Sequence, residues 1–450
     1  MNPQKCTMTV LAQIASFIPD RIVENLAGKH KIQTRSFSAD SHVVAMLYAH
    51  LAHSLSLNDV CDSLRNHAGA LSQIRNCTPP SRNGLSHANM TRSADMAEEL
   101  FWTIYKSLER QFPGFMASSR DYPGLPHRFR KRTLRAVDST TIRLNAMHMG
   151  WAQHRRRKAA AKMHTALDMR SFLPNFVIVK AAKDSDPKTA WELCAGMKDG
   201  EIAVFDKAYV DFRHLKELDG RGVFWVTRAK DNMVYETVGQ HTGGEWTTEG
   251  EASSCAGGAG KAGGPPAGVV GRQKKTRRRK YEWKKCVVLS DERIRLTGTK
   301  TQENYPGELR LVTAMVEVRN KMVRMTFITN NFEWSAFSIC QLYQCRRGVE
   351  VFFKELKQTL QLADFLGNSE NAVRWQVWTA LLAYLLLRFI AWQNKWRHQF
   401  CRLFTLLRAV LWNYFKMPSV LECCDTPHER HRHLIRGSPG TAYQPCFEGF

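Results

Sequence analysis

The sequence has few acidic residues for its size. Its 450 residues include 41 aspartates and glutamates against 65 lysines and arginines, which gives a net charge of +24. A cationic surplus of this size favours a large anionic partner such as nucleic acid. Charge alone leaves an anionic membrane surface open as an alternative partner.

Zinc-site cysteine spacing, a signal peptide and an apolar run of membrane length are all missing from the sequence. The 12 cysteines include no CxxC pair, so zinc-site spacing is missing and we expect reduced thiols. The first residues, MNPQKCTMTV, lack the charged and apolar regions of a signal peptide. The most apolar run, 377–392, contains Arg388 and is shorter than the roughly 20 residues of a membrane span, which favours a buried helix. We therefore expect a cytoplasmic protein with no membrane partner.

The chain is long enough for two to four structural units. Residues 1–120 have helical apolar spacing and are predicted to form a DNA-binding domain. Within it, a helix at 56–67 followed by a short polar helix at 84–92 would suit a helix-turn-helix reader of the major groove. An ordinary helical bundle would fit the same pattern.

Residues 130–230 have the pattern of a mixed α/β sheet, because strand-like runs are followed by alternating strand and helix. Strands are predicted at 134–144, 162–169, 175–182, 201–206 and 222–230, with a helix at 211–218.

An inserted β-rich subdomain is predicted at 231–332, with a flexible Gly, Ala and Pro-rich loop near 255–268. Its strands are expected at 280–289, 293–297, 308–318 and 323–329. Residues 333–416 are again helical in pattern, and 417–450 are predicted to be a polar tail.

One predicted helix, YQCRRGVEVFFKELK (343–357), carries a polar stripe. Tyr343, Arg346, Glu350 and Lys357 fall within an arc of about 60° on a helical wheel. An apolar stripe that includes Val349 lies beside it. A solvated face with ion pairs is the simpler interpretation. A carboxylate among cations and a phenol also suits a polyanion that lies along the helix and reacts at its middle.

Two aspartates, Asp138 and Asp206, are predicted to lie where strands end. Taken singly, each is more often a cap or turn former than a catalyst. Together with Glu350 they could form a cage of hard oxygen ligands drawn from different elements. Metal-dependent phosphoryl transfer needs such a cage, since two divalent ions must hold the attacking and leaving oxygens.

The spacing Tyr-x2-Arg-x3-Glu-x6-Lys at 343–357 resembles the signature of bacterial insertion-sequence transposases of the D-D-E type. Residues 206–212, 327–332 and 365–387 look similar to the same family. The resemblance implies a ribonuclease-H-like catalytic core with an inserted β subdomain, preceded by a helical N-terminal domain. It also implies that Asp138, Asp206 and Glu350 are catalytic metal ligands for two Mg²⁺ ions, which Mn²⁺ could replace.

The implied reaction is cut-and-paste transposition on double-stranded DNA, both terminal inverted repeats and target DNA, by a homodimer or larger assembly. Tyr343, Arg346 and Lys357 would then hold terminal phosphates. A second cationic group lies between two predicted strands and is either a DNA contact or a solvated turn. It comprises Arg155, Arg156, Arg157 and Lys158.

Two rival hypotheses remain on sequence grounds. A decayed or repurposed copy would bind terminal repeats without cutting them, although the three intact acids favour the enzyme. A membrane-surface protein would account for the basic charge and the run at 377–392.

Overall fold

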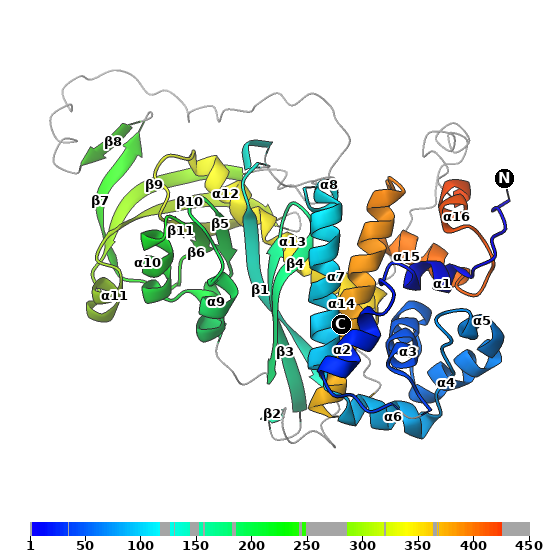
Figure 1. The fold of residues 1–450 in the computed structure, drawn as a ribbon. Coiled ribbons are helices and arrows are strands. Elements are labelled where there is room, and N and C mark those ends of the chain that lie inside the picture. Colours follow the sequence, from blue (N-terminus) through cyan, green and yellow to red (C-terminus); the bar gives the residue numbers. More distant parts are fainter. Residues whose placement is uncertain are drawn as a thin grey trace, which may run out of the picture. The chain divides into compact units, whose positions relative to one another are not determined.

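The computed structural model describes residues 2–34, 36–117, 127–129, 131–144, 153–155, 158–181, 186–242, 245–248, 286–318, 321–362, 367 and 369–424. The chain separates into two compact units (Figure 1). We call residues 1–85 with 382–450 the terminal unit and residues 86–381 the central unit. These units divide the chain at positions other than the predicted domain boundaries, which stay predictions.

The terminal unit is helical in the residues that the structure describes. Its helices are α1 (Val10–Ala15), α2 (Ile22–Lys29), α3 (Ala39–Ala52), α4 (Leu57–Asn66), α5 (Ala68–Ser72), α15 (Phe400–Ala409) and α16 (Met417–Cys424). Helix α3 lies at the centre, with residues 39–51 all buried. The first residues of the chain and the stretch between α15 and α16 are joined by an antiparallel bridge between Lys5 and Phe415.

Both short helices expected near the N-terminus are confirmed. Ser56 begins α4 with a capping box: its hydroxyl accepts from the Asp59 N–H, and the Asp59 carboxylate accepts from the Ser56 N–H. The second is α6 (Arg82–Thr91). The predicted polar tail starts too early, because 417–424 form α16 with Val420 and Leu421 buried. The rest of that tail lies outside the described residues.

Helix α14 (Glu370–Gln393) is long and apolar enough to cross a membrane by length and composition. Its most apolar window is 89% buried within the protein, as in a core helix. Arg388 is buried there, and its Nε donates to the Tyr384 hydroxyl at 2.9 Å. The prediction of a buried helix at 377–392 is thus confirmed.

The central unit holds an 11-stranded sheet in its described residues (Figure 1). Ten strands follow the order β2-β3-β1-β5-β6-β11-β10-β9-β7-β8, and β4 pairs with β3. The core strands are β1 (Leu134–Leu144), β2 (Gln153–Arg155), β3 (Lys158–Asp168), β4 (Leu173–Ala181), β5 (Ile202–Phe205) and β6 (Phe224–Arg228). Strand β1 is antiparallel to β3 and parallel to β5, and β5 is parallel to β6. This mixed arrangement is the one expected for a ribonuclease-H-like core.

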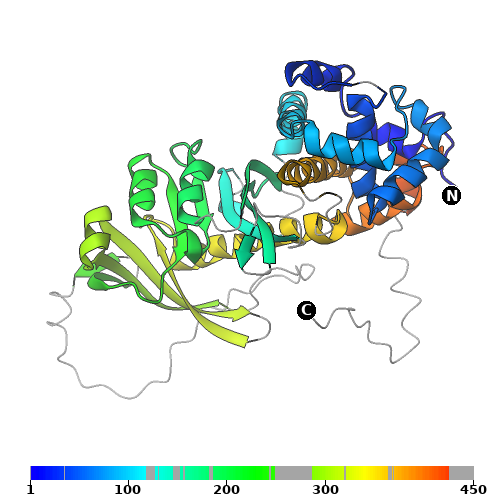
Figure 2. The same cartoon turned by 90° about the horizontal axis from the view of Figure 1, so that it is seen from below.

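The inserted strands extend the same sheet, because β11 pairs antiparallel with β6 (Figure 2). They are β7 (Tyr235–Thr242), β8 (Glu245–Thr248), β9 (Cys286–Leu296), β10 (Glu308–Val318) and β11 (Lys321–Thr329). The predicted strands at 280–289 and 293–297 correspond to one strand, β9, and residues 280–285 of the first lie outside the described residues. The charge of Asp291 in the middle of β9 is neutralised by Arg310, which is 1% exposed. Arg310 donates to both Asp291 carboxylate oxygens at 2.7 and 2.8 Å. The predicted loop near 255–268 lies outside the described residues.

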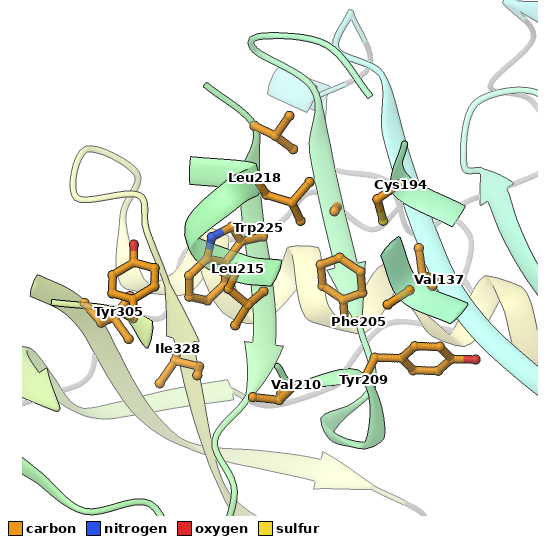
Figure 3. Close-up of a cluster of buried hydrophobic side chains, with 14 of the residues drawn as sticks. Val137, Cys194, Phe205, Tyr209, Val210, Leu215, Leu218, Trp225, Tyr305 and Ile328 are labelled. Atoms are coloured by element: carbon orange, nitrogen blue, oxygen red, sulfur yellow. The ribbon is translucent and has the colours of Figure 1, made fainter. Parts of the chain in front are cut away.

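A hydrophobic cluster fills one face of this sheet beneath α9 (Asp186–Cys194) and α10 (Phe212–Gly220) (Figure 3). Val137 of β1, Phe205 of β5 and Trp225 of β6 contribute to it. Helices α12 (Ala336–Cys345) and α13 (Arg347–Lys354) pack on the other face of the sheet. They lie behind the strands in Figure 3. The remaining helices of this unit are α7 (Asp95–Gln111), α8 (Pro113–Met116) and α11 (Thr299–Asn304).

The start of α14 is fixed against the junction between α6 and α7. Asn371 accepts from the Ala94 N–H at 2.9 Å and donates to the carbonyls of Asn89 and Arg92 at 2.8 and 2.6 Å. The Trp375 indole also donates to the Arg92 carbonyl. These bonds satisfy an N–H at the start of α7 and carbonyls at the end of α6, which the two helices leave open.

His214 of α10 makes the fold sensitive to acid. Burial lowers the pKa of this imidazole to about 4, so it stays neutral in the folded chain while the unfolded chain protonates near pH 6.5. We expect the parent to lose up to about 3 kcal/mol of unfolding free energy between pH 6.5 and 4. Denaturant unfolding of the parent and His214→Gln across this range checks it. An equal loss in both proteins would contradict the assignment.

Candidate active site

Asp138 of β1 and Asp206, the residue directly after β5, occupy matching positions along two parallel strands. Val137 of β1 pairs with Phe205 of β5, and the aspartates are the next residue along each chain. Val137 and Phe205 both point into the hydrophobic cluster. Since side chains alternate along a strand, we place both carboxylates on the opposite face, which α12 and α13 cover.

One detail of the sequence prediction is wrong. Asp138 does not end its strand, because β1 continues to Leu144 and pairs Asp138 with Thr165 of β3. Asp206 does follow the end of β5.

The turn that carries Asp206 is tightly fixed. Its carboxylate accepts from the Lys207 N–H at 2.7 Å and so begins a short 3₁₀ turn, Lys207–Tyr209. The Tyr209 hydroxyl forms a 2.9 Å hydrogen bond with Nδ1 of His164 on β3. Both side chains are almost fully buried. Sequence reasoning missed this pair, since nothing in the spacing of 164 and 209 links them.

Residues 343–357 do not form one continuous α-helix. Helix α12 ends at Cys345, Arg346 lies in a turn, and α13 begins at Arg347. A π-helical turn, Glu355–Thr359, follows α13. Each change of helix type alters the rotation per residue, so the predicted wheel angles do not hold across the segment.

Arg346 connects two of the three acids. Its Nη1 donates to Asp138 Oδ2 at 2.5 Å, and its Nη2 donates to Glu350 Oε1 at 2.7 Å. The side chains of Asp138 and Arg346 are 13% and 15% exposed, whereas that of Glu350 is 55% exposed. The guanidinium therefore holds the helix carboxylate to the strand carboxylate.

The charges of Asp206 and Glu350 act on Asp138, and the charges of all three acids act on Arg346. Burial raises the pKa of Asp138 to about 6, against the lowering effects of Arg346 and of the Ser139 N–H. The charges of Asp206 and Glu350 raise it further. Burial opposes the charge of Arg346, but the nearby Tyr343 and the acids raise its pKa overall. A desolvated carboxylate among others is a setting that favours a cation.

The remaining signature residues lie differently from the prediction. Tyr343 is buried, with its ring 5.0 Å from that of Phe327 and 5.7 Å below the Arg346 guanidinium. Burial raises the pKa of the Tyr343 phenol. Lys357, in the π-helical turn, donates from Nζ to the Thr141 carbonyl of β1 at 2.5 Å. Arg346 and Lys357 thus contact β1, whereas Tyr343 packs on Phe327 of β11, and the four residues do not form one solvent-facing stripe.

The second cationic group lies at a hairpin. Arg155 ends β2 and pairs with Lys158 at the start of β3. Arg156 and Arg157 lie outside the described residues. A DNA-binding role for these four residues stays a prediction.

The three acids suit a divalent metal by their chemistry. Carboxylate oxygens are the ligands that Mg²⁺ prefers. Among the residues that the structure describes, no three His, Cys, Asp or Glu side chains are arranged to hold a metal ion. The positive charge at this place belongs to Arg346, which contacts oxygens that a metal would need. The chemistry of the donors therefore fits a divalent ion, whereas their described arrangement has Arg346 as the counter-ion of Asp138 and Glu350.

Comparison with known proteins assigns the family. A family model described as "Transposase DDE domain" matches residues 129–386, more than half of the chain. The chain belongs to this transposase family. It is a DNA transposase, a DNA-cleaving and strand-transferring enzyme. A second model, "Domain of unknown function (DUF4372)", matches residues 7–74.

Two curated transposases are each similar to more than half of this chain. "Putative transposase y4zB" of Sinorhizobium fredii is 27% identical over 70% of this chain and 73% of its own length. "Probable transposase for insertion sequence element IS5377" of Geobacillus stearothermophilus is 28% identical over 59% of this chain and 58% of its own. Among solved structures, a piggyBac transposase synaptic complex with hairpin DNA matches 98% of this chain and 90% of its own, with 10% identity and a TM-score of 0.40.

The raised pKa of Asp138 predicts a stability cost at neutral pH. We expect Asp138→Asn to raise the unfolding free energy at pH 7.5 by roughly 1 to 3 kcal/mol, because a buried charge is removed. The gain should shrink as the pH falls through about 6, where the parent carboxylate takes up a proton. Parallel melts of both proteins from pH 5 to 8 measure it. A variant less stable than the parent at pH 7.5 would contradict the prediction.

Proposed function

We propose that this transposase moves an insertion sequence by a cut-and-paste reaction that depends on divalent metal. The observation that carries the proposal is the register of β1 and β5, which sets Asp138 beside Asp206, with Glu350 tied to Asp138 through Arg346. Acids drawn from two strands and one helix are what metal-dependent phosphoryl transfer requires.

Asp138, Asp206 and Glu350 are the proposed ligands of two Mg²⁺ ions, with Mn²⁺ as a substitute. When bound, such ions activate a water and stabilise the leaving oxygen of the phosphodiester. The pairing of β1 with β5 and the bond from the Lys207 N–H to the Asp206 carboxylate support this assignment. The freed 3′ hydroxyl at the element's end would then attack a phosphodiester of the target DNA.

Arg346 and Lys357 are the proposed contacts to DNA phosphates. Both are cationic and lie close to β1 near Asp138, where a scissile strand would pass. Tyr343 is better suited to support the Arg346 guanidinium from below than to face solvent. Arg155, Arg156, Arg157 and Lys158 would bind flanking or target DNA.

The partners follow from the reaction. The substrate would be double-stranded DNA with terminal inverted repeats, together with target DNA, and residues 1–120 would recognise the repeats. Joining two ends at one place calls for a homodimer or larger assembly.

Removing any one acid tests the chemistry. Asp138→Ala, Asp206→Ala and Glu350→Ala should each lower cleavage and strand transfer at least about 1000-fold, because each removes a metal-ligating oxygen. The assay incubates the full chain and Mg²⁺ with DNA that carries both segments flanking its gene. DNA binding, measured by gel shift in Ca²⁺, should persist.

Glu303→Ala is the matched control, since Glu303 is an exposed acid on α11. It should cut like the parent. An alanine variant of a proposed ligand that cuts as well as the parent would contradict its catalytic role. Binding without cutting by the parent itself would favour the decayed-copy hypothesis.

Lys357 is expected to contribute affinity without contributing chemistry directly. Lys357→Gln should weaken binding of the same DNA and flatten the plot of log affinity against log salt by about one unit of slope, since one phosphate contact is lost. Titrations at several salt concentrations measure this. An unchanged slope would show that Lys357 only holds β1 through Thr141.

A further inference from the structure

We infer that Arg346 is an exchangeable internal counter-ion of the acidic site, so that DNA phosphate and metal bind cooperatively. In this role Arg346 holds Asp138 and Glu350 together until a phosphate draws its guanidinium away. The inference rests on the proposed metal-dependent function and goes beyond it, because it assigns a regulatory consequence to one side chain.

The first support is the geometry of the guanidinium. Arg346 uses two different nitrogens for two carboxylates, Nη1 for Asp138 and Nη2 for Glu350, at 2.5 and 2.7 Å. Charge-assisted hydrogen bonds of this kind are stronger than neutral ones, and burial of both Arg346 and Asp138 limits screening by water. Two bonds from one planar group therefore fix the distance between strand and helix carboxylates.

The second support is competition for the same atoms. Asp138 Oδ1 accepts from the Ser139 N–H at 2.8 Å, and Oδ2 accepts from Arg346. The Ser139 bond belongs to the backbone beside Asp138 itself, so it stays in place. A cation that ligates Asp138 through Oδ2 and Glu350 through Oε1 competes with Arg346 for the lone pairs and the negative charge of both oxygens.

The third support is the position of Arg346 beside its cationic neighbours. Lys357 donates from Nζ to the backbone carbonyl of Thr141. Lys354, on the same helix as Glu350, is exposed. Arg346 bonds to both acids, so its charge competes directly with a metal for Asp138 and Glu350.

A DNA phosphate offers Arg346 an equivalent partner. A guanidinium binds phosphate oxygens with the same two-pronged geometry that it uses for carboxylates. Transfer of Arg346 to phosphate would free both acids for the metal. Linkage then requires that the metal strengthen DNA binding by the same factor. The enzyme would hold metal poorly until a DNA strand lies in the site.

The test titrates Mn²⁺ alone into the full chain by calorimetry, without DNA. Arg346→Gln should bind Mn²⁺ at least about 10-fold more tightly than the parent, because two charge-assisted bonds no longer compete. Lys354→Gln removes the same charge from an exposed position of α13 and should change the affinity less than about 3-fold. Equal or weaker binding by Arg346→Gln would overturn the inference.

Two further measurements keep the result decisive. Arg346→Lys, which keeps the charge but cannot bridge two carboxylates in one plane, should bind Mn²⁺ with intermediate affinity even if Arg346→Gln folds poorly. In Ca²⁺, which we choose to limit cleavage, a mixed-sequence duplex at low salt should raise the metal affinity of the parent more than that of Arg346→Gln. A duplex effect of equal size in both would also overturn the inference.

The outcome separates this inference from the proposed function. If the parent cuts DNA in Mg²⁺ but Arg346→Gln and the parent bind Mn²⁺ equally, the counter-ion role is wrong and the transposition proposal stands. If Asp138→Ala binds Mn²⁺ like the parent, the metal site itself is misassigned and both fall.

Discussion

The parallel pairing of β1 with β5 is the constraint on which the rest of the site depends. Backbone hydrogen bonds fix Val137 opposite Phe205. Both side chains point toward the hydrophobic cluster because their burial there is favourable. The following residues must then turn to the other face. A slip of one residue would bury the carboxylates in the core, where an unpaired charge is very costly. The core and the site therefore select the same register.

The sheet and its helices could largely be predicted from the sequence. Apolar runs and breakers placed β1 and β10 at their observed bounds, and they located the short helix that Ser56 begins. Strand β9 was divided in the prediction, because Asp291 interrupts the apolar pattern. Its partner Arg310 lies on another strand, so the compensation depends on tertiary contact and has no local signal.

For the site, spacing picked out the acids but gave no account of their surroundings. A helical wheel assumes one rotation per residue, but the segment 343–357 is interrupted at Arg346 and changes to a π-helical turn at Glu355. Tyr343 consequently enters the interior, and Lys357 reaches the carbonyl of Thr141. Periodicity also gave no hint that His164 and Tyr209 would meet across β1, because strand order is set only when the sheet assembles. Such contacts between distant segments are what a single sequence conceals.

Helix α14 belongs to both compact units, since the boundary at residues 381 and 382 falls within it. The terminal unit is assembled from the first 85 residues and the stretch that begins at residue 382. A gene copy that lost its 3′ portion would encode the complete N-terminal stretch without the helices that complete its fold. Loss of coding sequence at either end of such a gene would therefore damage the terminal unit, and neither end of the chain would form an independent domain.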